Sequence, residues 1–178
     1  MRSLLIALFL CAPLSAQLIE WGVKGGVPFN DAIQAAGTFS SNFQRWTVGP
    51  VIEVNLPASL SVEFNALYRR TGYSNSITGG DYTSGSLEFP LLAKYKFPGS
   101  LARMYIDGGF VFRHIADIGL LNEADSKGLV FGVGFRYNLG LVKISPEFRY
   151  TRWDNQPFQL PNLTSARNQS EFLVGLTF

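Results

Sequence analysis

Alternating polarity along the chain constrains the fold more than any other feature of the sequence. Apolar and polar residues alternate in eight stretches, most of them about ten residues long, which is the length that a tilted strand needs to cross a bilayer. The last stretch shows the pattern, since Phe172, Val174, Leu176 and Phe178 share one face of a strand and Glu171 lies on the other. The stretches cover residues 19–24, 46–56, 60–69, 86–97, 103–113, 129–137, 142–151 and 170–178. The sequence therefore predicts an all-β fold.

The connections between these stretches alternate in length. Short turns are expected near residues 57–59, 98–100 and 138–140, and long polar segments cover residues 28–44, 72–85, 114–127 and 153–168. Short turns at one rim and long loops at the other are typical of an eight-stranded antiparallel up-and-down transmembrane β-barrel. The even strand number places both termini at the short-turn, periplasmic side. Three prolines, Pro50, Pro90 and Pro146, lie inside predicted strands, where we expect bulges to accommodate them.

Two barrels fit this periodicity, a soluble exported binding barrel of the lipocalin kind and a membrane barrel with its apolar face outward. The polar face mixes charges of both signs with glycines, which favours a narrow lumen filled by paired charges. The predicted lumen charge network consists of Glu20, Glu53, Glu63, Glu88, Lys94, Arg103, Asp107, Arg136, Lys143, Glu147, Arg149 and Glu171. The same polar face also contains Lys24, Arg69 and Lys96. Aromatic residues near the strand ends resemble two interfacial girdles and are Trp21, Trp46, Tyr68, Tyr95, Tyr137 and Tyr150. The girdles favour the membrane barrel.

The first sixteen residues have the pattern of a cleaved secretory signal. Arg2 precedes a short apolar run from Leu4 to Leu10, and small residues follow up to Ala16. We therefore expect a signal peptide at residues 1–16, an exported barrel domain at residues 17–178 and a bacterial outer-membrane location. The only cysteine, Cys11, lies in the signal, so no disulfide or thiolate metal site is expected. The balance of 15 basic against 13 acidic residues argues against nucleic acid as a partner.

Three segments resemble known outer-membrane barrels. The stretch SLEFPLLAKYKF, with Glu88, Pro90, Lys94 and Tyr95, is similar to the fourth strand of the PorT-type outer-membrane β-barrel family, and SPEFRY is similar to the penultimate strand of such barrels. The resemblance implies an outer-membrane barrel, without implying one activity; some members are linked to protein secretion. The final stretch resembles the C-terminal strand that outer-membrane assembly machinery recognises. By that resemblance, the assembly signal consists of Phe172, Val174, Leu176 and Phe178.

Catalytic chemistry finds little support in the sequence. Some outer-membrane barrels are lipid A deacylases with a Ser near the catalytic His, but here His114 is the only histidine and residue 116 is Ala. We therefore expect a non-enzymatic membrane protein without cofactor or metal, whose structural, adhesive or other interaction role resides in its long extracellular loops. Its expected partners are outer-membrane lipid, the assembly machinery and an extracellular ligand or protein. A lipid-modifying enzyme and the soluble binding barrel are the alternatives.

Overall fold

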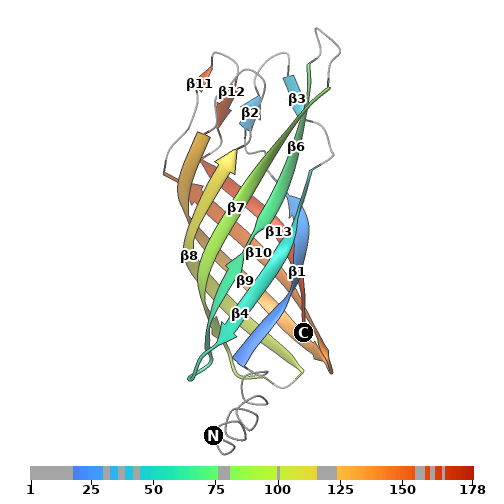
Figure 1. The fold of residues 1–178 in the computed structure, drawn as a ribbon, viewed down its shortest axis with the longest axis vertical. Helices are drawn as coiled ribbons and strands as arrows, with labels where there is room; N and C mark the ends of the chain where they lie inside the picture. Colours follow the sequence, from blue (N-terminus) through green and yellow to red (C-terminus); the bar gives the residue numbers. More distant parts are fainter. Residues whose placement is uncertain are drawn as a thin grey trace, which may run out of the picture.

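A computed structural model gives the fold of the chain (Figure 1). It describes residues 18–29, 33–35, 39–41, 45–75, 81–99, 101–115, 124–154, 159–160, 163–165 and 167–178. The predicted signal peptide at residues 1–16 lies outside these ranges. Among the described residues, no helix has the length and apolar character that spanning a membrane would require.

The described structure is almost entirely antiparallel sheet. Nine long strands make up its body: β1 (Ile19–Pro28), β4 (Trp46–Asn55), β5 (Leu60–Asn65), β6 (Leu67–Asn75), β7 (Asp81–Lys96), β8 (Ala102–Ile115), β9 (Ala124–Leu139), β10 (Val142–Trp153) and β13 (Asn168–Thr177). Four short strands are β2 (Ile33–Ala35), β3 (Phe39–Ser41), β11 (Gln159–Leu160) and β12 (Leu163–Ser165). Strand β1 pairs with β13 on one side and with β4 on the other, so the sheet closes. The predicted eight-stranded antiparallel barrel is confirmed.

Strands β5 and β6 together form one of the eight spans, and Pro50 explains why they are separate. Ala66 lies between them, opposite Pro50 of β4, and donates its N–H to the Pro50 carbonyl at 3.1 Å. Proline has no N–H to return, so the ladder stops for one residue. The pairing of Val51 with Asn65 and of Val48 with Tyr68 keeps one register across the break.

Pro146 interrupts its ladder in the same way. Strand β10 pairs with β9 at Ile144 and again at Glu147, with no change of register between these pairs. On its other side, Pro146 keeps its partner Val174 of β13. Pro90 likewise stays in register with Val111 of β8. The expected bulges are therefore wrong: each barrel span accommodates its proline without an inserted residue.

The two ends of the barrel differ. Short turns join β4 to β5, β7 to β8 and β9 to β10 at one end, called the short-turn end, where the C-terminus also lies (Figure 1). The short strands β2, β3, β11 and β12 lie at the opposite, long-loop end (Figure 1). Strands β7 and β9 have 16 residues each, more than the crossing requires. The long segments expected at residues 72–85 and 114–127 are therefore strand in part, and the barrel wall continues past a bilayer's thickness.

Along most of the wall, buried and exposed side chains alternate. In β13, Glu171, Leu173 and Thr177 are buried, whereas Phe172 and Leu176 are exposed. The same alternation places a continuous set of large apolar side chains on the outside and charged side chains on the inside. A lipocalin-like barrel would have the opposite arrangement, so the soluble alternative does not fit the structure.

Candidate functional site

The lumen contains the main concentration of charged side chains, and strand periodicity places them there. Every second residue of a barrel strand points inward, so eight spans direct their polar positions to one axis. Because an unpaired buried charge is costly, such a lumen is stable only if its charges neutralise each other. The side chains form three clusters along the barrel axis, described in turn below.

The central cluster has balanced charge, with Glu63, Asp107 and Glu147 against Lys24, Lys94 and Arg149. Lys24 Nζ lies 2.5 Å from Glu63 Oε1 and 2.9 Å from Glu147 Oε2, which joins two carboxylates through one ammonium. The Nε and Nη2 atoms of Arg149 lie 2.8 Å and 2.6 Å from Glu147 Oε1. Lys94 pairs with Glu63 and lies 3.4 Å from Glu53. Through Lys24 of β1, these contacts link Glu63 of β5 to Glu147 of β10 on the opposite side of the barrel.

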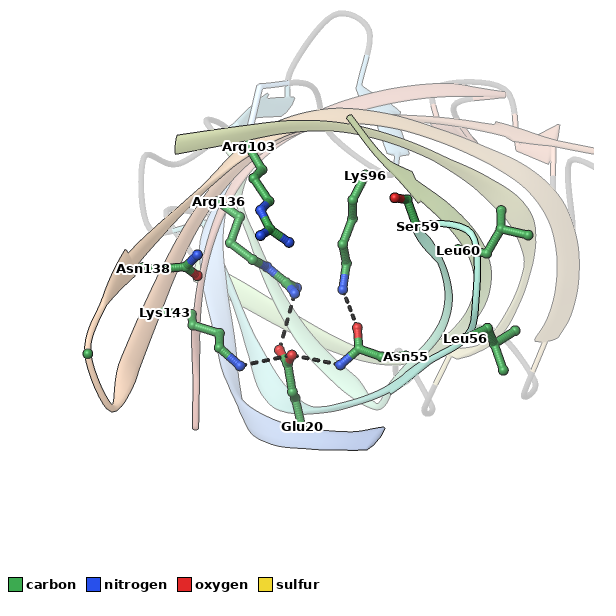
Figure 2. Close-up of a pocket in the computed structure, with 11 residues that line it drawn as sticks. Glu20, Asn55, Leu56, Ser59, Leu60, Lys96, Arg103, Arg136, Asn138 and Lys143 are labelled. Atoms are coloured by element: carbon green, nitrogen blue, oxygen red, sulfur yellow. Dashed lines mark hydrogen bonds and ion pairs between the residues drawn. The ribbon is translucent and has the colours of Figure 1, made fainter. Parts of the chain in front are cut away.

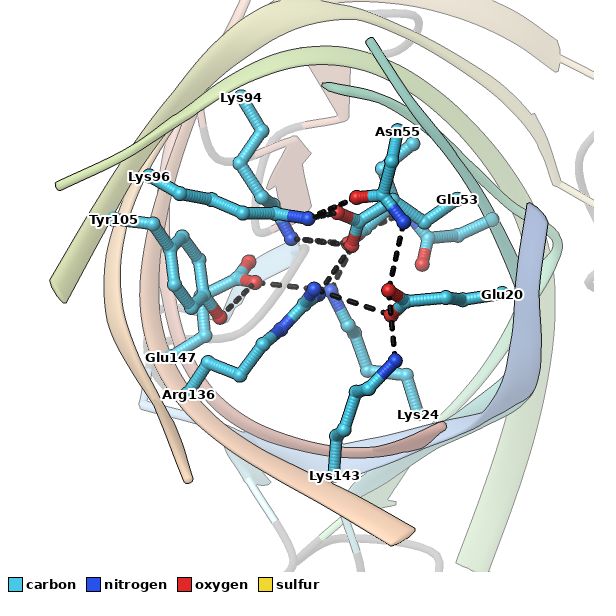
Figure 3. Close-up of polar contacts among 12 residues, drawn as sticks. Glu20, Lys24, Glu53, Asn55, Lys94, Lys96, Tyr105, Arg136, Lys143 and Glu147 are labelled. Carbon is cyan, nitrogen blue, oxygen red and sulfur yellow. Dashed lines mark hydrogen bonds and ion pairs between the residues drawn. The ribbon is translucent and has the colours of Figure 1, made fainter. Parts of the chain in front are cut away.

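The mouth cluster lies toward the short-turn end and consists of Glu20, Glu53, Lys96, Arg136 and Lys143 (Figure 3). Arg136 bridges both carboxylates, since it lies 3.1 Å from Glu20 Oε2 and also pairs with Glu53. Lys143 lies 2.9 Å from Glu20 Oε1, and Lys96 pairs with Glu53. The Asn55 amide donates to Glu20 at 2.7 Å and accepts from Lys96.

The long-loop cluster consists of Arg69, Glu88, Arg113 and Glu171, all buried. Arg69 lies 2.6 Å from Glu171 and 3.0 Å from Glu88. Arg113 lies 2.9 Å from the same Glu88 carboxylate. Two arginines and two glutamates thus neutralise each other.

An apolar cluster of Leu92, Val111, Val130 and Trp153 accompanies the charges inside the barrel. Trp153 is 1% exposed, and its indole N–H donates to Gln169 at 2.9 Å. The guanidinium of Arg113 lies 3.6 Å above the Trp153 ring, a cation–π contact that fixes both side chains. Side chains of both kinds therefore fill the lumen, as the narrow diameter of an eight-stranded barrel requires.

Glycines of β9 make room for two inward side chains of β8. Gly134 of β9 lies directly opposite Tyr105 of β8, and a Cβ at Gly134 would overlap the Tyr105 ring. The Tyr105 hydroxyl donates to Glu147 at 3.0 Å, so this ring is part of the central cluster. Gly132 has the same relationship to Asp107. Glycines on one strand thus leave space for the inward side chains of the next.

Most of the predicted network residues are buried in the lumen, and three differ from the others. Arg103 is exposed at the short-turn end, where its Nε donates to the Gly99 carbonyl at 2.7 Å; among the described residues it has no carboxylate partner. Asp107 is buried, but neither of its carboxylate oxygens has a hydrogen-bond partner in the described part of the chain. Lys143 pairs with Glu20 while remaining 27% exposed. Arg103 thus lies outside the ion-pair network in which the sequence placed it.

Several lumen residues were not part of the predicted network. Lys24, Arg69 and Lys96 were predicted on the polar face, although outside the network, and all three are buried in the lumen. Arg113 also continues the alternation of β8, two residues beyond Val111. Trp153 belongs to a segment expected to be loop, and Gln169 lies between that segment and the last predicted stretch; the extension of β10 and β13 turns both inward. No periodic signal in the predicted strands reaches these two positions.

The predicted girdle aromatics lie on the outer wall, exposed except for Tyr150, which is half-buried. At the short-turn end Trp21 contacts Phe178, and Tyr95 contacts Phe97 edge-on at 5.0 Å between ring centroids. Toward the long-loop end Trp46 contacts Tyr68 at 5.5 Å. Tyr137 lies near the short-turn end of β9, and the hydroxyl of Tyr150 donates to Asn168 at 2.9 Å. The outward residues of the final strand are Phe172, Val174, Leu176 and Phe178.

A cavity of about 400 Å³ opens at the short-turn end of the lumen (Figure 2). Its polar wall includes four cationic side chains and one carboxylate, which are Lys96, Arg103, Arg136, Lys143 and Glu20. Among the described residues, no group of three His, Cys, Asp or Glu is placed to hold a metal ion. His114, on β8, is half-buried and pairs in register with Leu87 and Asp125. The cavity is large enough to admit a small ligand.

Comparison with known proteins agrees with this architecture. Residues 3–178 match the family described as outer membrane protein beta-barrel domain. The solved structure of neisserial surface protein A has 14% sequence identity and a TM-score of 0.57, covering 90% of this chain and 95% of that chain. The N-terminal β-barrel domain of OprF from Pseudomonas aeruginosa has 18% identity and a TM-score of 0.50, covering 90% and 96%. These likenesses concern the fold alone. No curated protein sequence matches this chain.

Proposed function

The chain belongs to the outer membrane protein beta-barrel domain family, and from this premise we propose that it is a non-conducting outer-membrane barrel that acts through its long-loop end. The filled lumen is the observation that carries this proposal. Ion pairs cross the lumen between strands that are not neighbours at three levels, and Trp153 and Leu92 are buried among them. A barrel stabilised in this way is suited to hold loops rigidly rather than to pass solutes.

The proposed orientation follows from the same asymmetry. Short turns face the periplasm in bacterial barrels, and longer loops face outward. We assign residues 1–16 to a signal that is removed on export, and the final strand to the contact with the assembly machinery. The narrower kinship with PorT-type barrels is also a proposal, supported by Glu88, Pro90 and Lys94 of β7.

At the outer surface, the proposed role is adhesion or another interaction. Strands β7 and β9 extend the wall beyond the membrane and would support the loops that make contact. In this proposal the chain catalyses no reaction. We therefore expect outer-membrane lipids from cells with and without the protein to give the same mass spectra. New or missing acyl chains would support the lipid-modifying alternative instead.

Two experiments test the proposal. Purified barrel in planar lipid bilayers is expected to give no stable open channel, and a large steady conductance would contradict the filled lumen. For the loops, a variant with residues 155–166 replaced by a short Gly-Ser linker is displayed on a non-adherent host beside the unchanged chain. We expect both to fold with heat-modifiable gel mobility and only the unchanged chain to increase adherence to cultured cells. Equal adherence of the two would contradict a role for this loop.

A further inference from the structure

Charge is unevenly distributed along the lumen, and the excess lies at the short-turn end. The central cluster and the long-loop cluster each balance acids with bases. The cavity at the mouth instead has four cations in its wall against two carboxylates, Glu20 in the wall and Glu53 of the mouth cluster, which pairs with Lys96 and Arg136. The Glu20 carboxylate already accepts from Arg136, Lys143 and Asn55 at 2.7–3.1 Å. Among the described residues, Arg103 is therefore the wall cation that pairs with neither carboxylate.

Arg103 and Arg136 form the least expected contact in this wall. They are direct cross-strand partners on β8 and β9, and Figure 2 shows their guanidinium groups side by side. Like charges directly opposite each other destabilise a sheet. Among the described residues, Arg103 has no carboxylate partner, and the buried Nε of Arg136 has no hydrogen-bond partner. A negatively charged ligand between the two side chains would remove both costs.

We propose that this mouth is a binding site for a phosphate-type oxyanion, either a lipid headgroup phosphate or a soluble phosphate. Guanidinium groups present paired donors that match the oxygens of phosphate, and Lys143 adds a partly exposed ammonium. The cavity of about 400 Å³ is within the range of small-ligand sites. Ser59 and Asn138 contribute neutral polar groups to the same wall.

The rim leaves access to both sources of phosphate. The cavity opens at the end of the lumen, where solvent reaches Arg103. On the outer wall beside it, Leu56 and Leu60 are exposed and point away from the cavity, toward the region that lipid would occupy (Figure 2). The site is independent of the long loops, so its test does not depend on the proposed adhesion.

The test measures binding by phosphorus NMR titration of the barrel in a detergent without phosphate. The probes are inorganic phosphate and a short-chain phosphatidylglycerol below its micelle concentration. Arg103→Gln is the informative variant, because Arg103 is exposed and its loss leaves the buried network unchanged. Arg152→Gln, which changes an exposed arginine toward the other end of β10, is the matched control.

We expect saturable binding of at least one probe to the unchanged chain, and about tenfold weaker binding to Arg103→Gln, as loss of a charged hydrogen bond implies. The control should bind like the unchanged chain. Binding of the lipid alone would identify a headgroup site, and equal binding of both probes a soluble phosphate site. Absence of saturable binding, or equal losses in both variants, would overturn the proposal.

Discussion

Trp21 and Phe178 contact each other where the first and last strands of the barrel meet. Their ring centroids lie 5.7 Å apart, and the N–H of Phe178 donates to the Trp21 carbonyl at 2.9 Å. This pair lies on the outer wall at the short-turn end, next to the pairing of Gly22 with Thr177. The ring contact therefore lies at the seam that closes the barrel, at the height expected for the membrane interface.

Phe178→Ser should reduce assembly more than it destabilises the folded barrel. The substitution removes the ring contact with Trp21 and the apolar end of the final strand, while the backbone hydrogen bond to Trp21 remains possible. The measurement is the amount of heat-modifiable protein in outer-membrane fractions. Leu141→Ser, at an 89% exposed residue of the same end, is the control and should assemble normally. Normal levels of Phe178→Ser would contradict the assigned role.

Glu63→Gln should destabilise the barrel strongly. Glu63 is buried and lies near three cations, Lys24, Lys94 and Arg149, which would lose a shared partner. Removing one member of a buried ion pair costs about 3–5 kcal/mol of unfolding free energy. Urea unfolding in lipid vesicles, followed by tryptophan fluorescence, measures the change.

Lys143→Gln provides the comparison for the buried network. Lys143 is 27% exposed in its pair with Glu20, so its loss should cost no more than about 1 kcal/mol. If it destabilises the barrel as much as Glu63→Gln, burial is not what gives the lumen network its strength.

Gly134→Ala should also destabilise the barrel, through a clash rather than a lost contact. The added methyl would overlap the Tyr105 ring and the Pro146 carbonyl, and the backbone atom has little freedom to move. Overpacking of this kind costs roughly 1–3 kcal/mol. Gly175→Ala is the matched control, since a Cβ there meets neighbours at 3.4 Å or more. Equal urea midpoints for the two variants would show that the Tyr105 ring and the backbone near Gly134 shift enough to admit the methyl group.

The β4–β5 turn is expected to gain stability from Ala58→Asn with Ser59→Gly. Ala58 and Ser59 have φ angles of 62° and 64°, in the left-handed region that costs a residue with a Cβ about 1–2 kcal/mol. Asn-Gly is the preferred pair for a hairpin turn with two positive φ values. The urea midpoint should rise for the double variant. Ser59→Ala keeps the Cβ and should leave the urea midpoint unchanged. A higher midpoint for Ser59→Ala would mean that relief of backbone strain does not explain the gain of the double variant.

The pattern of residues was sufficient to predict the barrel and the direction of most side chains. A period of two assigns Glu63 inward and Phe64 outward without knowledge of any partner, because successive side chains of a strand point to opposite faces. Alternating loop lengths supplied the up-and-down topology. For the same reason, the predicted network included most of the buried acids and bases.

The sequence by itself determined which residues face the lumen, but only the tertiary structure decided which of them meet. Arg103 and Asp107 share the inward face of β8, yet the first is exposed at the mouth and the second is buried beside Gly132. Strand ends, tilt and register set the height of each side chain along the barrel axis, and periodicity contains none of these quantities. Only the paired strands therefore place Arg103 opposite Arg136 and turn Trp153 into the lumen.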